Sequence, residues 1–183
     1  YGIIGIRIQK ELKGEVCIQL QIKNLEKKEI CISRSFAYPI DSLVELKQAI
    51  ANYVIIGCAK LRKYNQLTSA ITIFTTTNHY SKDFFKGEAM AKLQIPSDDT
   101  RNILKTSLEL TTKIFRPYNK LIKAGIIMSN LQSNKHQQAL LFSEQDIKQE
   151  IHRNILNKIV DNINQKNGRE TLNWSSSIIE KDL

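Results

Sequence analysis

The sequence predicts an α+β domain in which four strands and two helices follow one another in the order β-α-β-β-α-β, with a C-terminal helical extension. Apolar and polar residues alternate in four stretches, which is typical of half-buried strands. Two stretches with helical spacing of apolar residues separate these strands. Because two crossovers of the same hand place both helices on one face of the four-stranded sheet, the opposite face should stay open.

The first strand is expected within residues 28–36. The residues expected to face the core are Ile30, Ile32 and Phe36. Those expected to face the open side are Cys31, Ser33 and Ser35. Arg34 breaks the alternation, so either the strand bulges there or its core-facing part ends near Ile32. The alternation alone favours an ordinary half-buried strand over a contact with DNA.

The two helices have recognisable ends. The first should begin at a capping box formed by Ser42 and Glu45 and end at the cations of residues 60–63. The second should begin at Ser-Asp-Asp, residues 97–99, and end before Pro117. The adjacent carboxylates in residues 97–99 could cap the helix or bind a metal ion. Their place in a first helical turn favours capping.

The other three strands are expected at residues 67–77, 87–95 and 120–131, with a long hairpin connection at residues 78–86. The residues expected to face inward on the third strand are Ala89, Ala91, Leu93 and Ile95. Lys123 lies near the start of the fourth strand. The residues expected to line the open face are Ser33, Ser35, Thr72, Phe74, Thr76, Met90, Lys92 and Gln94.

The positive charge of the chain is concentrated in this domain. Residues 28–133 hold 15 Lys and Arg against 8 Asp and Glu, whereas residues 134–183 hold equal numbers. A polyanion is therefore the natural partner, and the solvated hydroxyls and lysines of the open face suit a phosphate backbone. No stretch combines a basic face with a broad aromatic one, so a membrane surface is not favoured.

The cysteines and histidines indicate neither disulfides nor a metal site. Cys17, Cys31 and Cys58 lie in apolar runs, so we expect buried thiols in a reducing compartment, which favours a cytoplasmic protein. The histidines lack metal-ligand spacing to one another or to a cysteine. The chain starts at Tyr1 within an amphipathic pattern, so we take it as a piece of a longer protein.

Several separated blocks closely resemble the UmuC family, the catalytic subunits of bacterial DNA polymerase V among the Y-family translesion polymerases. The blocks are residues 31–36, 45–53 with 59–62, 92–101, 114–117 and 124–128. The resemblance implies the end of the thumb and a linker in residues 1–27 and the little finger domain in residues 28–133. It further implies a spacer with a clamp-binding peptide in residues 134–142, and a C-terminal helix and tail in residues 143–183.

In that family the little finger holds the DNA backbone, so the resemblance implies a DNA-binding segment of an error-prone polymerase that acts in SOS mutagenesis. The residues assigned to DNA contact are Ser33, Arg34, Ser35, Thr72, Thr76, Lys92, Gln94 and Lys123. The catalytic palm, with the carboxylates that bind Mg²⁺, would lie before Tyr1, so this chain should need no cofactor and should not synthesise DNA. The strands carry few arginines, so lysine and threonine would have to provide more of the contacts.

The segment after the domain resembles a bacterial sliding-clamp-binding peptide of the pattern Gln-x-x-Leu-Phe. Leu141 and Phe142 would fill an apolar pocket on the clamp, with Gln138 hydrogen-bonded at its rim. The alternative is a hydrophobic staple for a following helix that Ser143 would cap. Its place after a little finger domain and a polar spacer favours the clamp peptide.

Isoleucines recur every four residues from Ile147 to Ile163, which predicts an amphipathic helix with a narrow apolar stripe. The stripe could pack on its own domain or bind a partner. In the UmuC family this region is associated with the UmuD′ dimer and with RecA, so the alternative function is a protein-interaction module with minor DNA contact. A ferredoxin-like enzyme is not favoured, because no nucleophile and base are paired in the sequence.

Overall fold

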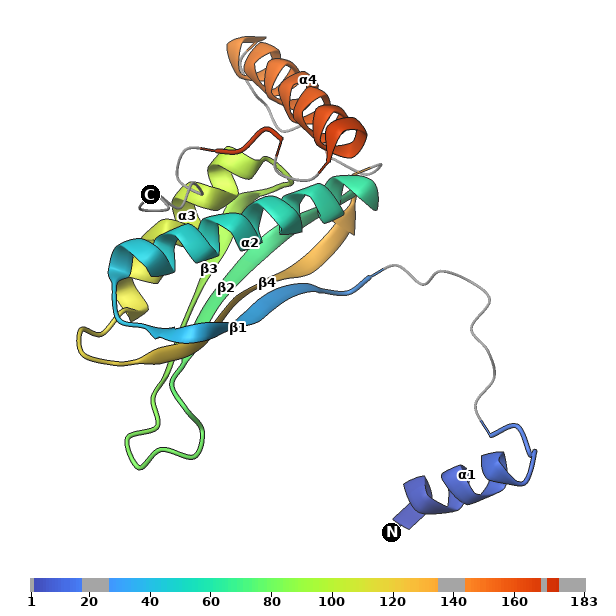
Figure 1. Cartoon of the computed structure of the whole chain (residues 1–183). Coiled ribbons are helices and arrows are strands. Elements are labelled where there is room, and N and C mark those ends of the chain that lie inside the picture. The colour runs from blue at the N-terminus through green and yellow to red at the C-terminus, as the bar shows by residue number, and fades with distance from the viewer. Residues whose placement is uncertain (1, 18–26, 135–143, 169–170, 175–183) are drawn as a thin grey trace.

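Figure 1 shows the computed structural model of the chain, which describes all residues except 1, 18–26, 135–143, 169–170 and 175–183, and only the backbone of residues 144–154. The elements are α1 (Gly2–Leu12), β1 (Ile30–Ile40), α2 (Leu43–Lys63), β2 (Gln66–Thr76), β3 (Lys86–Ser97), α3 (Thr100–Ile114), β4 (Leu121–Ser133) and α4 (Glu144–Asn167). The predicted α+β class, the order β-α-β-β-α-β and the C-terminal helix are confirmed.

The sheet is antiparallel throughout, with the strand order β1-β4-β2-β3. The last strand in the sequence therefore lies in the middle of the sheet, paired with β1 on one side and β2 on the other. Both crossover helices cover the same face, as Figure 1 shows, with α2 over β1 and β4 and α3 over β2 and β3.

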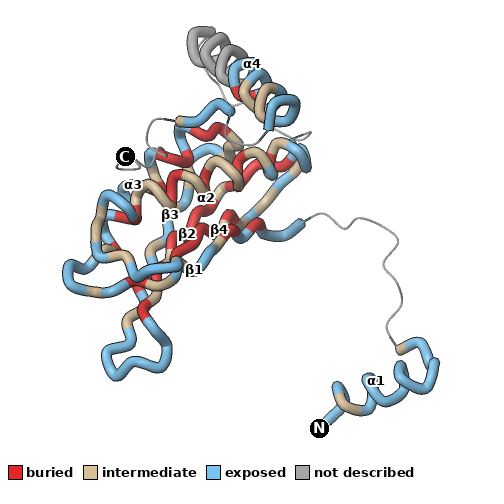
Figure 2. Tube along the Cα trace, viewed as in Figure 1, coloured by how far each residue is buried: buried red, intermediate tan, exposed pale blue. Residues whose placement is uncertain are grey.

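The core lies between the sheet and these helices (Figure 2). Ile71 of β2 and Ile126 and Met128 of β4 are fully buried, and each such side chain contributes about 1.5–3 kcal/mol when removed from water. Gly57 lets α2 approach β4 closely, because a Cβ at this position would lie 2.6 Å from Met128 Cε. A side chain at this position would force the end of the Met128 side chain to move.

The two helix starts are capped differently. Ser42 occupies the N-cap position of α2, but its side chain makes no capping hydrogen bond, so the predicted capping box does not form. Asp99 is the N-cap of α3 and accepts a hydrogen bond from the backbone N–H of Arg101 at 3.4 Å. The carboxylate pair therefore supplies a cap, as the position in the first turn suggested.

The structure corrects two predictions about burial. Cys31 is exposed and Cys17 is half-buried, so only Cys58 is the buried thiol that the apolar runs predicted. Cys31 lies on the face of the sheet that no helix covers, so the apolar residues next to it in the sequence do not shield its side chain from solvent. Ile95 was expected inside but is 38% exposed, because the pairing of β2 with β3 shifts register beyond Lys92.

The C-terminal helix α4 packs on the domain through polar side chains. Asn157 is buried and donates a hydrogen bond to Asp99 Oδ1 at 3.1 Å. One turn further, Asp161 accepts two hydrogen bonds from Arg62 of α2, at 2.5 and 2.8 Å. Ile155 and Ile159, from the predicted stripe, are each 52% exposed. The exposure of these two isoleucines therefore does not support the alternative in which the isoleucine stripe packs on its own domain.

Within the described residues, none of the helices has the length and apolar character needed to cross a membrane.

Candidate nucleic-acid interface

The uncovered face of the sheet is built from rows of side chains that run across all four strands. Because directly paired residues point to the same side, the register defines these rows. One row consists of Ser35, Lys123, Thr76 and Lys86. The next consists of Ser33, Gly125, Phe74 and Glu88, and a third of Cys31, Ile127, Thr72 and Met90. Lys92 lies beyond them, paired with Ala70.

The structure brings most of the predicted contact residues together on this face. Those that the register places there are Ser33, Ser35, Thr72, Thr76, Lys92 and Lys123. Gln94 follows Lys92 by two residues on β3 and is exposed. Thr72 is buried between its neighbours with 9% of its surface exposed, so it offers little to a ligand.

Arg34 is separated from the others. It pairs with Ala124, a core residue, so its side chain belongs to the helix-covered face, at the exposed edge of the sheet. The strand stays in register through Ser35 and becomes irregular only between Ser35 and Ile40. The register therefore excludes a bulge at Arg34. The fully buried part of β1 does end at Ile32, and Phe36 is only partly buried against the core. Burial raises the pKa of Tyr53 on α2, and the positive charge of Arg34 acts against that rise.

Lys86 is a cation of the open face that the sequence analysis missed, because it was assigned to the hairpin connection. Continuing the alternation backwards from Met90 through Glu88 would have found it. Lys86 Nζ lies 2.7 Å from Glu88 Oε2, and both side chains are about half exposed, so this ion pair adds little stability. Lys92 and Lys123 form no ion pair within the described part of the chain, and their charges remain available to a polyanion.

The centre of the open face is flat because Gly125 has no side chain. A Cβ there would lie 2.5 Å from Ser33 Cβ and 2.6 Å from Phe74 Cζ, so the phenyl ring of Phe74 lies over the glycine. Met90 lies in the next row of this face, paired with Thr72, and 58% of its surface is exposed. The face thus combines hydroxyls and lysines at its ends with an apolar centre.

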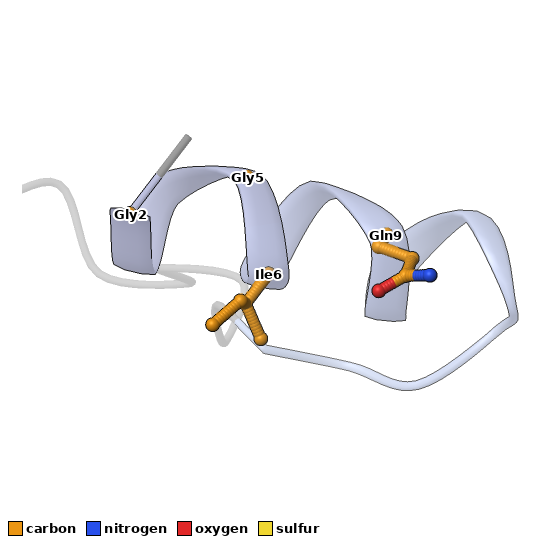
Figure 3. Close-up of a pocket in the computed structure, with 4 residues that line it drawn as sticks. All are labelled: Gly2, Gly5, Ile6 and Gln9. Carbon is orange, nitrogen blue, oxygen red and sulfur yellow. The ribbon is translucent and has the colours of Figure 1, made fainter.

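Within the described residues, the pocket on α1 and the buried thiol present no group arranged for catalysis. The only pocket drawn in Figure 3 is a shallow hollow on α1, lined by Gly2, Gly5, Ile6 and Gln9, without a charged or nucleophilic group. No group of His, Cys, Asp and Glu side chains in the described residues could hold a metal ion. Burial raises the pKa of the Cys58 thiol to about 12, so this cysteine is protonated and unreactive at neutral pH.

The proposed clamp-binding residues Gln138, Leu141 and Phe142 lie outside the described residues, so their assignment stays a prediction.

Comparison with known proteins identifies the domain. Residues 27–141 match the family model described as the impB/mucB/samB family C-terminal domain. UmuC of Salmonella typhimurium is 28% identical over 174 residues, which cover 94% of this chain and 41% of that protein. MucB of Escherichia coli is 31% identical over 144 residues, which cover 78% of this chain and 34% of that protein.

The chain therefore carries the C-terminal, little finger domain of a Y-family translesion polymerase. It belongs to the impB/mucB/samB family, with UmuC, MucB and ImpB among its relatives. It spans about two fifths of the length of UmuC. Among solved structures, a chain from the insertion ternary complex of Dbh DNA polymerase aligns with a TM-score of 0.49 and 12% identity, over 72% of this chain and 36% of that one.

Proposed function

We propose that this domain binds DNA through the open face of its sheet, as the DNA-holding and clamp-docking segment of an error-prone translesion polymerase in SOS mutagenesis. The observation that carries the proposal is the uncovered row formed by Ser35, Lys123, Thr76 and Lys86, which crosses all four strands. Short hydroxyls allow close approach to phosphates, and the flanking lysines supply charge. Because none of these groups reads a base edge in a fixed pattern, binding should depend little on sequence.

The proposal leaves catalysis to the rest of the parent polymerase. This domain would position the template and primer, while the parent's palm, with its Mg²⁺, would carry out nucleotide transfer in the bacterial cytoplasm. The domain itself would require no cofactor. The domain would contribute affinity for the duplex. That affinity would determine how much DNA the parent polymerase makes before it releases the duplex.

Removing two open-face lysines should weaken duplex binding and its salt dependence together. Each lysine–phosphate interaction adds about 0.9 to the steepness with which log K falls with log salt concentration, so Lys92→Ala/Lys123→Ala should reduce that steepness by about 2. Fluorescence anisotropy with a labelled 20-base-pair duplex at increasing NaCl measures this slope.

A matched control is Lys105→Ala/Lys113→Ala, which removes the same charge from exposed positions on α3, a helix on the covered face. Its slope should stay close to that of the unmodified chain. If the two double variants behave alike, net charge rather than the open face governs binding, and the proposed interface is wrong. Duplex binding that is insensitive to salt would also contradict the proposal.

The Gln-x-x-Leu-Phe segment supports a second contact, with the bacterial sliding clamp (the β subunit of the replicative polymerase). The chain should bind the clamp at micromolar concentration in surface plasmon resonance. Leu141→Ala/Phe142→Ala should abolish this binding, because the two apolar side chains would fill the clamp pocket. Leu140→Ala, a neighbouring apolar residue outside the pattern, should leave binding intact. Equal clamp binding by all of these variants would assign the segment a structural role instead.

The exposed apolar side chains of α4 favour one further candidate function, binding of a protein partner such as UmuD′ or RecA. Ile155, Leu156 and Ile159 each have about half of their surface exposed, on a helix that the domain holds by other residues. Binding of purified UmuD′ or RecA, together with no measurable duplex binding, would favour this function over DNA holding.

A further inference from the structure

Three connections meet at one end of the sheet: the one between β1 and α2, the hairpin between β2 and β3, and the one between α3 and β4. In Figure 1 the β2–β3 hairpin projects well beyond this end. Each connection, or the strand residues beside it, carries an exposed tyrosine. Tyr38, Tyr80 and Tyr118 have 84%, 94% and 96% of their surface exposed. Because tyrosine rings in folded proteins are usually at least partly buried, three exposed rings at one end of a domain indicate a binding site.

The hairpin holds Tyr80 in an ordered loop. The backbone N–H of Tyr80 donates to Asn78 Oδ1 at 3.0 Å, which is an Asx turn, and Phe85 N–H donates to Thr77 Oγ1 at 2.8 Å. The ring of His79 contacts the ring of Tyr80 edge-on, with the centroids 5.8 Å apart, and that of Phe84 at 5.1 Å. These rings support one another but leave the tyrosine ring open to solvent.

Tyr118 is held in a conformation that its side chain disfavours. Its φ is +74°, the left-handed region. The N–H of Asn119 donates to the carbonyl of Arg116 at 3.4 Å, so residues 116–119 form a β-turn with Pro117 in its second position. A turn of this type normally has glycine in its third position, where this chain has tyrosine. A bulky residue that accepts such strain and still points into solvent is the kind of outlier found at functional sites.

Cations surround these rings. Lys82 lies in the hairpin, and Arg116 and Lys120 flank Tyr118. Lys86 and Lys123 belong to the open-face row nearest this end of the sheet. Of these five cations, Lys86 is the only one with an ion pair within the described residues, and its partner is Glu88; the hairpin itself carries one acid, Asp83. The surroundings are therefore basic, without the wide apolar patch that a protein partner or a lipid surface would need.

We propose that this end of the sheet is a binding site for unpaired nucleotides of single-stranded DNA, whose bases stack on Tyr80 and Tyr118, with Tyr38 as a further platform. Exposed aromatic rings within a basic surface are the combination that binds single strands, because every base offers a π-face and the phosphates meet the cations. In a duplex the bases stack on each other and cannot use such rings. Four strands about 4.8 Å apart make this end roughly 15 Å wide, enough for a short run of nucleotides. The inference rests on the proposed function only in naming DNA as the polyanion.

The test uses the whole 183-residue chain with a 12-nucleotide single strand that contains 2-aminopurine, and with a duplex of the same length. Stacking should quench the 2-aminopurine fluorescence on binding. Tyr80→Ala/Tyr118→Ala should weaken single-strand binding at least 10-fold and remove the quenching, since stacking on an aromatic contributes strongly per base. Duplex affinity should change less than about 2-fold in this variant.

Two controls separate stacking from other effects. Tyr80→Phe/Tyr118→Phe keeps the rings and should keep both binding and quenching. Tyr64→Ala removes another exposed tyrosine, at the opposite end of the sheet, and should also leave single-strand binding unchanged. No single-strand binding, or an equal weakening of single-strand and duplex binding in the alanine variant, overturns the inference. Absence of duplex binding with tyrosine-dependent single-strand binding overturns the proposed duplex-holding function and leaves this inference standing.

Tyr118→Gly offers an independent test, because it relieves the strained φ and removes the ring. It should raise the melting temperature by about 2–4 °C while weakening single-strand binding. A melting temperature that falls, together with unchanged binding, would show that the tyrosine serves the fold and would overturn its role as a stacking platform.

Discussion

Arg62→Met should release α4 from the domain and cost about 3 kcal/mol of folding free energy. The Arg62 side chain is only 13% exposed, and its guanidinium contacts elements far apart in the sequence. It donates to both carboxylate oxygens of Asp161, to the carbonyl of Asp98 at 2.9 Å and to Thr100 Oγ1 at 3.1 Å. Methionine keeps the volume but leaves these acceptors without a donor, which is the costly way to break a buried pair.

Hydrogen–deuterium exchange and urea unfolding measure the two parts of this effect. Exchange should speed up in residues 155–167 of α4, and the unfolding midpoint should fall. Asp161→Asn is the matched control, because it weakens the attachment of α4 and leaves the bonds from Arg62 to Asp98 and Thr100 in place. It should speed exchange in α4 and lower stability by less. Unchanged exchange in the Arg62→Met variant would mean that α4 is held by other contacts.

The cost of Arg62→Met should also grow with pH. Burial already raises the pKa of Asp98 above its ordinary 3.8, and Arg62 opposes the rise. Removing Arg62 therefore raises this pKa further. When the pKa of a carboxyl is higher in the folded state than in the unfolded state, the carboxyl stabilises the fold at pH values where it is protonated in both states. This stabilisation is lost as pH rises through the folded-state pKa. The variant should lie closer to the unmodified chain at acidic pH than at neutral pH.

Gly125→Val should cost about 3 kcal/mol, the second large effect we expect. A Cβ at this position would come within 2.5 Å of Ser33 Cβ and 2.6 Å of the Phe74 ring, and valine adds two methyl groups. The Phe74 ring can swing toward solvent, but Ser33 Cβ is fixed by the pairing of β1 with β4. The strands must therefore separate, and urea unfolding should show a lower midpoint.

A double-mutant cycle with Gly125→Ala and Phe74→Ala tests the cause of this cost. If the ring over the glycine is responsible for part of it, Gly125→Ala should cost less in the Phe74→Ala background than alone. If the changes in unfolding free energy of the two single variants are additive, the Phe74 ring does not contribute and the steric clash is with Ser33 alone. A Gly125→Val variant as stable as the unmodified chain would contradict the close packing on the open face.

Local sequence patterns predicted the elements and one face of the sheet, because helical spacing, alternation and turn residues act over short distances. The alternation of Ser33, Ser35, Thr72 and Thr76 placed these residues correctly on the open face. The same alternation places Arg34 on the side of Ile30 and Ile32, and its pairing with the core residue Ala124 confirms that side. Its assignment to DNA contact rested on its charge, but a long cation can occupy a core-side position at a sheet edge and keep its charge in water.

The attachment of α4 was not predictable for a related reason. Its isoleucines drew attention to one side of the helix, whereas the domain holds the other side through Asn157 and Asp161. Those contacts depend on Arg62 and Asp99 being brought to the same place by the fold. The strained turn at Tyr118 is likewise visible only in the backbone, because tyrosine itself gives no signal of a positive φ.

The central position of β4 also has a consequence for how the chain acquires its structure during synthesis. Since β4 lies between β1 and β2, residues that leave the ribosome first cannot form the sheet until residues 121–133 have followed them. Until then β1 has no neighbouring strand, and the β2–β3 pair has an open edge where β4 belongs. Such unpaired edges invite aggregation, and pairings between distant segments form slowly. A nascent chain that stalls before β4 should therefore depend on chaperones, and completion of this one strand should mark the moment at which the domain becomes cooperative.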